Sequence, residues 1–315
     1  MSSTLTYMKD EKAPSTLIEA VRHFSDPDVC VAFVASLRWP DGPVCPKCDG
    51  TEHSYLTTRR LWKCKACKRQ FSVKVGTIFE DSPIPLDKWL AAIWLIANSK
   101  NGISSHELGR SIGLTQKSAW FVLHRVRLAM QTGSFAKFSG EIEVDETFVG
   151  GLAKNMHADV RKRKITGTGG KGKTAVIGIR ERGGDIKATV IPDRTRQTLQ
   201  RHVRDQVEKG SAVYTDAFSS YSGLSTDYDH GVVDHAERYV IGRVHVNQVE
   251  NFWTLLKRGL KRTYVQVAPA HLFRYVDERV FTYNKRDLTD FGRFVSVLGQ
   301  VTGRRLTYAA LTGKT

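Results

Sequence analysis

Three acidic residues stand where carboxylates could be held rigidly enough to bind metal ions. Asp145 lies within the apolar run EIEVDETFV, Asp216 follows the run AVYT, and Glu250 lies near the start of an amphipathic helical segment. Phosphoryl transfer by two metal ions needs carboxylates that converge from separate elements, with about 3.5–4 Å between the ions. Oxygen ligands select hard cations, so Mg²⁺ or Mn²⁺ is expected. A lone aspartate at a strand end is more often structural, but three acidic residues in this arrangement predict a catalytic metal site.

Four cysteines predict a metal site of a different kind. The pairs C-P-K-C and C-K-A-C are separated by fifteen residues, a spacing typical of structural zinc sites. Four thiolates complete a tetrahedral shell with no open position, so this Zn²⁺ is expected to stabilise folding. Incidental cysteine pairs or a redox dithiol are the alternatives, and Cys30 is expected to be a buried apolar residue. The expected zinc ligands are Cys45, Cys48, Cys64 and Cys67.

A helix-turn-helix-like stretch follows the cysteines. An amphipathic helix over 86–99 precedes a short helix that ends at Gly113, and Thr115 can cap the longer helix after it. In helix-turn-helix proteins the first residues of the second helix enter the major groove of DNA. The alternative is a plain three-helix bundle whose charges are solvated. The expected DNA contacts are Gln116, Lys117 and Ser118, with Arg125 and Arg127 further along the helix.

The acidic residues require strands and helices to position them. Alternating apolar residues predict a strand over 141–149 and a hairpin around Gly183-Gly184, and a helix ending at Gly210 precedes a strand that contains Asp216. Helices are expected over 248–261 and from Pro269 onward. The basic, glycine-rich segment 154–173 cannot form a core and is predicted to be a mobile loop. If the first strand is regular, Glu146 points away from Asp145 as a surface or supporting group.

The composition favours a nucleic-acid partner. The formal net charge is +16 and the pI is about 9.7, and such an excess of Lys and Arg suits phosphates better than most other partners. An anionic membrane surface is the competing interpretation, weakened because the longest apolar stretch, Trp89–Ala97, is too short to span a bilayer. The first residues do not resemble a secretory signal, and cysteines in C-x-x-C pairs suit a reducing compartment. A cytoplasmic, nucleoid-associated protein is expected.

Several motifs of the chain resemble one family. The runs VDETFVGG, KTAVIGIRERGG, NQVENFWTLLKRGLKRTY and PAHLFRYVDERVFTYNKR are similar to those of bacterial insertion-sequence transposases. The similarity is to the family that combines an N-terminal zinc ribbon with a DDE-type, RNase H-like catalytic domain, and it covers about residues 25–300. It implies an α/β catalytic domain, a mixed sheet flanked by helices, behind the zinc ribbon and the helical region.

The resemblance implies roles for individual residues. Asp145 and Asp216 are the implied metal ligands, and the segment around Glu250 supplies the third. Members of this family often carry asparagine there, so Asn251 and Asn247 remain alternatives, although a carboxylate binds a divalent cation better than an amide. His245, just before this helix, is expected to be a hydrogen-bonded structural residue, although it could approach the site. On the helix, Lys257 lies two turns beyond Glu250, where it could hold a phosphate. Arg258, Lys261 and Arg262 continue a basic face that could follow the DNA backbone or simply be solvated.

The expected organisation is an N-terminal helical segment (1–40), a zinc ribbon (41–82), a helix-turn-helix-like region (83–135) and an RNase H-like catalytic domain (140–300). The implied activity is binding of double-stranded transposon ends, metal-dependent hydrolysis that frees a 3′-OH, and attack of that hydroxyl on target DNA. Pairing two ends implies a homo-oligomer on DNA. A DNA-binding regulator without activity, and a nuclease or resolvase that cuts without joining, are the alternatives.

Overall fold

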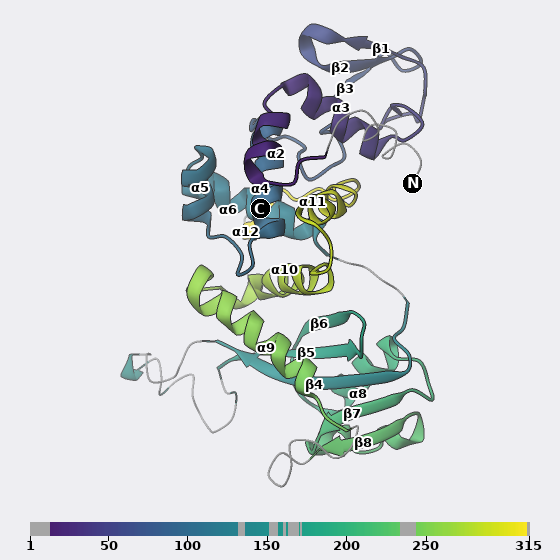
Figure 1. Cartoon of the computed structure of the whole chain (residues 1–315), viewed down its shortest axis with the longest axis vertical. Helices are drawn as coiled ribbons and strands as arrows, with labels where there is room; N and C mark the ends of the chain where they lie inside the picture. Colours follow the sequence, from purple (N-terminus) through teal and green to yellow (C-terminus); the bar gives the residue numbers. More distant parts are fainter. Residues whose placement is uncertain are drawn as a thin grey trace. The chain divides into compact units, whose positions relative to one another are not determined.

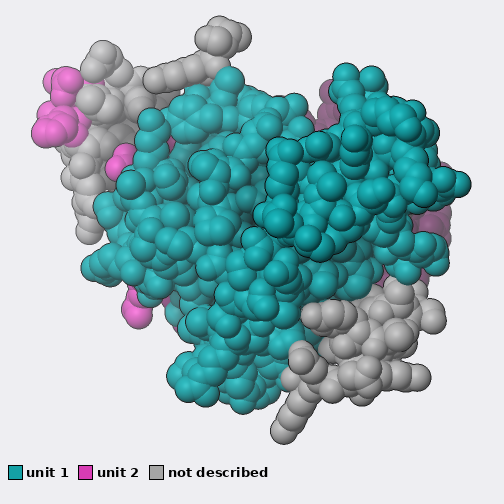
Figure 2. Space-filling model, turned by 90° about the horizontal axis from the view of Figure 1, so that it is seen from above, with its two compact units in different colours: residues 1–131, 287–315 teal, residues 132–286 magenta. Residues whose placement is uncertain are grey.

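The chain folds into two compact units. The computed structural model describes residues 13–131, 136–150, 157–159, 162, 170, 172–233 and 244–313. One unit contains the chain up to Gln131 together with the residues from Asp287 on, and the other contains the residues between them (Figure 2). The chain therefore leaves the first unit, completes the second and returns. The second unit ends at Arg286, whereas the sequence-based boundary places residues up to 300 in the catalytic domain.

Helices of the first unit share an aromatic core. α2 (Leu17–His23) begins with a capping box, and α3 (Pro27–Arg38) begins at the Asp26 cap, which is followed by proline. The returning chain supplies α11 (Asp290–Leu298) and α12 (Tyr308–Thr312), and α11 contacts α4 (Leu86–Asn98). Phe294 of α11 is fully buried, and its ring stacks on Phe33 of α3 at a centroid distance of 6.1 Å. α11, which follows the second unit in the sequence, is thus part of the core of the first unit.

A three-stranded antiparallel sheet carries the cysteines. Its strands follow the order β1 (His53–Leu56), β2 (Leu61–Cys64) and β3 (Gln70–Phe71) (Figure 1). The indole of Trp62 on β2 is buried and lies between the rings of Tyr55, Phe71 and Trp39. The sheet is small, so this aromatic contact and the cysteine cluster carry most of its packing.

The helix-turn-helix-like region has the predicted layout. α5 (Ser105–Ile112) ends at Gly113, whose φ of +66° is left-handed, and α6 (Gln116–Ala129) begins at the Thr115 cap. A Cβ on Gly109 would lie 2.8 Å from the carbonyl oxygen of Leu114, so the turn passes too close to α5 for a side chain there. The tight α5–α6 packing therefore depends on these two glycines.

The second unit is built on a five-stranded mixed sheet. The strands are β4 (Glu141–Val149), β5 (Thr174–Glu181), β6 (Ile186–Ile191), β7 (Ala212–Asp216) and β8 (Asp229–Val233). Their order is β6-β5-β4-β7-β8, with β4, β5 and β6 antiparallel and β4, β7 and β8 parallel (Figure 1). β5 and β6 form the predicted hairpin, and Gly183 in its turn has a φ of +74°.

Helices cover the two faces of this sheet. α8 (Arg196–Gln206) packs Leu199 and Val203 on the face that carries Ile142 and Val144 of β4. The opposite face is covered by α9 (Asn247–Gly259), which continues as a π-helical turn (Leu260–Tyr264), and by α10 (Leu272–Asn284). Alternate residues of β4 therefore face different layers. The mixed sheet with helices on both faces confirms the predicted α/β fold class.

Three sequence-based details differ from the structure or lie outside it. α8 ends at Gln206 and not at Gly210, because the chain becomes extended at Val207 and Gly210 belongs to the turn before β7. Pro269 opens a short 3₁₀ turn, and α10 starts only at Leu272. The predicted loop over 154–173 falls mostly outside the described residues. Within the part of the chain that the structure describes, no helix has the length and apolarity that crossing a bilayer needs.

Candidate functional site

The four predicted zinc ligands lie together. Their sulfur atoms are all within 4.8 Å of one another, and Cys45–Cys67 and Cys48–Cys64 are each separated by 3.6 Å. A tetrahedron of Zn–S bonds of about 2.3 Å requires sulfur atoms about 3.8 Å apart, so the cluster fits this ion. The N–H groups of Lys47 and Cys67 lower the pKa of Cys45 and Cys64, respectively, which favours the thiolate form that a cation binds. In the described residues this is the one group of candidate ligands so closely gathered.

The predicted DNA-contacting residues of α6 divide into two groups. Gln116 and Lys117 are exposed and Ser118 is half-buried in the first turn of the helix. The Gln116 amide donates to Ser105 of α5, 2.9 Å away, which fixes this end of α6 against α5. The first turn is thus accessible to a ligand.

Arg125 corrects the prediction for the rest of α6. Its side chain is buried, with an exposed fraction of 3%, and Arg127 is buried as well. The Arg125 guanidinium donates to the carbonyl oxygens of Leu306 and Glu80 at 2.9 and 2.7 Å. Arg125 therefore holds the first unit together and cannot reach DNA, because the helix rotates it into the core three residues past Val122.

Asp145 and Asp216 lie on one face of the sheet. Glu143 of β4 pairs with Tyr214 of the parallel strand β7, and the two aspartates follow two residues later on each strand. Side chains two residues apart on a strand share a face, so both aspartates lie on the face covered by α9. The charge of Asp216 contributes to a raised pKa at Asp145, which is consistent with this proximity.

Trp253 of α9 holds Asp145 directly. Its indole N–H donates to Oδ2 of Asp145 at 2.9 Å. The indole is accommodated by Gly178, the cross-strand partner of Asp145, because a Cβ at Gly178 would lie 2.7 Å from the indole ring. Burial and the neighbouring charge of Glu146 raise the pKa of Asp145 to about 7, although the indole bond opposes them. A carboxylate this costly to ionise is what a bound cation would stabilise.

α9 presents Glu250 and Lys257 on the side that carries Trp253. At about 100° per residue, Glu250 lies about 60° and Lys257 about 40° from Trp253 around the helix axis. On the same basis Asn247 lies about 120° and Asn251 about 160° away, so Asn251 is on the far side. Glu250 and both asparagines are exposed. Burial lowers the pKa of Lys257, and the charge of Asp145 opposes this shift. The structure thus brings Asp145, Trp253 and Lys257 together, with Glu250 one turn earlier.

The basic residues beyond Lys257 are on the surface. Arg258 is exposed in the last turn of α9, and Lys261 and Arg262 are exposed in the π-helical turn that follows. They continue the cationic character of the helix past the acidic residues. Their exposure contrasts with the burial of Arg125.

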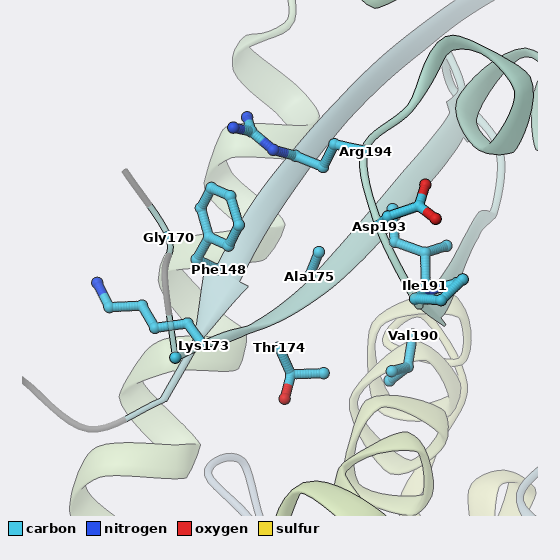
Figure 3. A pocket seen from close by; sticks show the side chains of 11 residues that line it. Phe148, Gly170, Lys173, Thr174, Ala175, Val190, Ile191, Asp193 and Arg194 are labelled. Atoms are coloured by element: carbon cyan, nitrogen blue, oxygen red, sulfur yellow. The ribbon is translucent and has the colours of Figure 1, made fainter. Parts of the chain in front are cut away.

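Three features of this site were not predicted from the sequence. Trp253 was assigned no role, although a tryptophan three residues after a candidate ligand is a usable signal. The side chains of Glu143 and Glu146 are both buried, although Glu143 was given no role and a surface position was left open for Glu146. A pocket of about 820 Å³ also lies at the ends of β5 and β6, where Phe148, Lys173 and Arg194 line it (Figure 3). None of the three predicted catalytic carboxylates lines this pocket.

Comparison with known proteins agrees with the geometry. Residues 137–284 match the ISXO2-like transposase domain, and residues 25–70 match the transposase zinc-ribbon domain. An uncharacterized protein in transposable element ISH50 of Halobacterium salinarum is 29% identical over 242 residues, which are 72% of this chain and 81% of that protein. An uncharacterized transposase-like protein of Haemophilus influenzae is 27% identical over 104 residues, 33% of this chain and 84% of that protein.

The two domain matches together cover more than half of the chain, and each coincides with one of the two candidate metal sites. The first match contains the acidic residues on β4, β7 and α9, and the second contains the four cysteines. With this pair of domains, the chain belongs to the insertion-sequence transposases that combine a zinc ribbon with an ISXO2-like transposase domain.

Proposed function

We propose that this protein binds the ends of an insertion sequence and catalyses metal-dependent cleavage and strand transfer of DNA. The observation that carries the proposal is the position of Asp145 and Asp216. They lie on one sheet face, Asp145 in the middle of β4 and Asp216 at the end of the parallel strand β7, beneath the helix that presents Glu250 and Lys257. Carboxylates from three separate elements on one face are the arrangement that two-metal phosphoryl transfer needs.

Asp145, Asp216 and Glu250 would hold the divalent cations, Mg²⁺ or Mn²⁺. When bound, the cations would activate the attacking oxygen and stabilise the leaving oxygen of the scissile phosphate. Trp253 orients Asp145 by fixing its Oδ2 atom. Lys257 lies close enough to sense the charge of Asp145 and is free to hold a phosphate oxygen beside it. The protein thus contributes positioning and charge neutralisation without a covalent intermediate.

Glu250 is the preferred third ligand. It shares the helix side of Trp253 and Lys257, and a carboxylate binds a hard cation more strongly than an amide. Asn247 is the nearer of the two asparagine alternatives and Asn251 lies on the opposite side of α9. Replacement of each residue by alanine separates them, because only the true ligand should change the Mg²⁺ concentration that half-saturates cleavage.

DNA contact is proposed for both units. In the first unit the accessible first turn of α6, with Gln116, Lys117 and Ser118, would enter the major groove. In the second unit Arg258, Lys261 and Arg262 would follow the phosphate backbone leading away from the metal site. The partners are double-stranded element ends and target DNA, and a homo-oligomer would form on them because two ends must be paired.

A strand-transfer assay tests the proposal. The purified protein is incubated with the DNA ends that flank its gene and a plasmid target, with Mg²⁺, with Mn²⁺ or with a chelator. Joined products that need metal and disappear in Asp216→Ala are expected. Cleavage without joining would replace the proposal with a nuclease or resolvase, and end binding without cleavage under every metal condition would indicate an inactive regulator.

A further inference from the structure

β4 carries two buried glutamates on either side of Asp145. Glu143 has no exposed surface, and the side chain of Glu146 is 3% exposed. Burying a carboxylate is unfavourable unless its oxygens accept hydrogen bonds or meet a positive charge. The groups that donate hydrogen bonds to these two carboxylates therefore indicate which parts of the structure the glutamates hold in place.

Glu143 caps the helix that carries Glu250. α9 has no side-chain cap from its own sequence, since Val246 occupies the cap position. Instead Oε2 of Glu143 accepts hydrogen bonds from the N–H groups of Gln248 and Val249, at 2.9 and 3.3 Å. These are first-turn N–H groups that find no partner within a helix. A negative charge at this end also suits the helix dipole, so a strand residue performs the capping that the helix lacks.

Arg182 extends the same connection. Its Nε donates to Oε1 of Glu143 at 2.9 Å, and its Nη2 donates to the carbonyl oxygen of His245 at 3.0 Å. Nδ1 of His245 is 3.2 Å from Oε1 of Glu143. The backbone entering α9 is therefore tied to β4 from both sides of its first turn. The direction in which α9 leaves the sheet, and so the place of Glu250 and Trp253, depends on this cluster.

Glu146 performs the corresponding task on the opposite face of β4. Its Oε2 accepts a hydrogen bond of 2.6 Å from the hydroxyl of Tyr221, in the 3₁₀ turn Ser219–Tyr221 that follows Asp216 closely. Its Oε1 accepts one of 3.1 Å from Arg194, whose own carbonyl oxygen accepts from the Ser220 hydroxyl at 2.9 Å. The segment after β7 is therefore tied to β4 at two points.

Arg194 is itself fixed by aromatic rings. Its guanidinium lies 4.4 Å from the ring centroid of Phe148, and both side chains are labelled in Figure 3. It also lies 4.6 Å from the ring centroid of Phe218. Phe218 donates its N–H to Oδ1 of Asp216 at 3.1 Å. A guanidinium between two rings has little freedom to move. Glu146 and Arg194 together hold the turn that orients Asp216.

We propose that Glu143 and Glu146 are positioning residues for the other two metal ligands: Glu143 fixes α9 and hence Glu250, and Glu146 fixes the turn after β7 and hence Asp216. Asp145 lies between them and belongs to the same strand. The proposal rests on the metal site proposed above. It assigns one strand the task of setting the spacing of all three carboxylates.

The Glu143 contact is tested by hydrogen exchange and metal titration of the full-length, zinc-loaded protein without DNA. In Glu143→Ala the amides of Gln248 and Val249 should lose protection, and Mn²⁺ affinity should fall by about 10- to 100-fold, as for other groups that support metal ligands. Glu143→Gln keeps an oxygen acceptor for the two amides and should recover most of both. Glu141→Gln is the matched control, since Glu141 also accepts from Arg182, and its other bond is to the hydroxyl of Tyr214 on β7 rather than to the amides of Gln248 and Val249.

The Glu146 contact is tested by Glu146→Ala and by Tyr221→Phe, which removes only the hydroxyl. Both should weaken Mn²⁺ binding, the alanine variant by about 10-fold or more, while the amides of Gln248 and Val249 keep their protection. Glu146→Gln retains an acceptor for Tyr221 and should lie between wild type and alanine. Separate signatures for the two glutamates support two distinct anchors.

The outcomes distinguish this inference from the proposed metal site. If Asp145→Ala abolishes Mn²⁺ binding but Glu143→Ala and Glu146→Ala bind within twofold of wild type, the positioning roles are wrong. If wild type and Asp145→Ala bind Mn²⁺ equally, the metal site itself is wrong. Unchanged exchange of Gln248 and Val249 in a folded Glu143→Ala protein would overturn the capping role whatever the metal result.

Discussion

The cysteine cluster and the carboxylates of the proposed catalytic site are assembled in opposite ways. The four thiols come from two C-x-x-C turns within 23 residues of sequence, and neighbouring backbone N–H groups lower the pKa of two of them, Cys45 and Cys64. The carboxylates come from β4, β7 and α9, across more than 100 residues, and they are held by Trp253, Arg182, Arg194 and Tyr221. One site is assembled by local sequence and the other only by the completed fold.

The zinc is expected to be needed for folding, whereas the cations proposed for the carboxylates are expected to bind a site that is already folded. A closed thiolate shell links strands that have little core of their own, so its ion and its fold form together. The carboxylates lie on a sheet whose core is complete on both faces. The second unit is therefore expected to fold without the metal proposed for its carboxylates. Four experiments test this difference between the two sites.

Zinc removal should give the largest effect. Cys64→Ser, or a strong zinc chelator, should unfold the ribbon, because structural zinc contributes on the order of 10 kcal/mol to such domains. The fluorescence of the six tryptophans should change as Trp62 loses its ring contacts. Zinc addition should restore the chelated protein, and a ribbon that stays folded without zinc would contradict the contrast.

Loss of a carboxylate should abolish catalysis without unfolding. Asp145→Ala and Asp216→Ala should reduce DNA cleavage by at least about 10³-fold, about 4 kcal/mol of transition-state stabilisation, while end binding stays within about twofold. Cleavage assays and gel shifts measure the two quantities, and Asp193→Ala, at an exposed turn, is a control. Parallel loss of binding would show that these aspartates are structural.

The close packing behind Asp145 should be moderately sensitive. Gly178→Ala places a methyl group against the Trp253 ring and should lower the free energy of unfolding by about 1–3 kcal/mol, as overpacking does. In a Trp253→Phe background the cost should shrink, because the benzo ring that the methyl meets is absent. Chemical denaturation of the single and double variants measures this coupling, and additive costs would argue against the contact.

The pH dependence should be the smallest effect. Because the pKa of Asp145 is raised from 3.8 to about 7, its contribution to stability is complete below about pH 4 and is lost as the pH rises through about 7. Without Mg²⁺ or Mn²⁺, wild type should lose roughly 1–2 kcal/mol more than Asp145→Asn between pH 5 and 8, since partial exposure reduces the full effect. Thermal unfolding measures it, and added Mn²⁺ should remove the difference.

Local signals in the sequence predicted most of the fold. The C-x-x-C pairs, the Gly113–Thr115 turn and the Gly183-Gly184 hairpin each involve residues close in the chain, and the structure has all three. The helix boundary at Gly210 was wrong because the chain becomes extended at Val207 before any glycine is needed.

Tertiary contacts limited the prediction of the sites. The sequence predicts Arg125 to be a surface charge that contacts DNA. Its guanidinium is instead buried, because it donates hydrogen bonds to the carbonyl oxygens of Glu80 and Leu306, which are far away in the sequence. For Glu146 the sequence left a surface and a supporting role open, because its partners Tyr221 and Arg194 belong to other elements. One usable signal was present: EIEVDE places charged residues on both faces of a strand that is otherwise apolar, which indicates partners on each side.

The return of the chain to the first unit has a consequence for biosynthesis. α11 inserts Phe294 among Phe24, Phe33 and Trp94, and this helix leaves the ribosome after the entire second unit. The core that the N-terminal helices share with α11 therefore stays incomplete until translation is nearly finished. A stop codon just after Arg286 would spare every residue of the second unit and leave the first incomplete. The part of the protein that is made first is finished last.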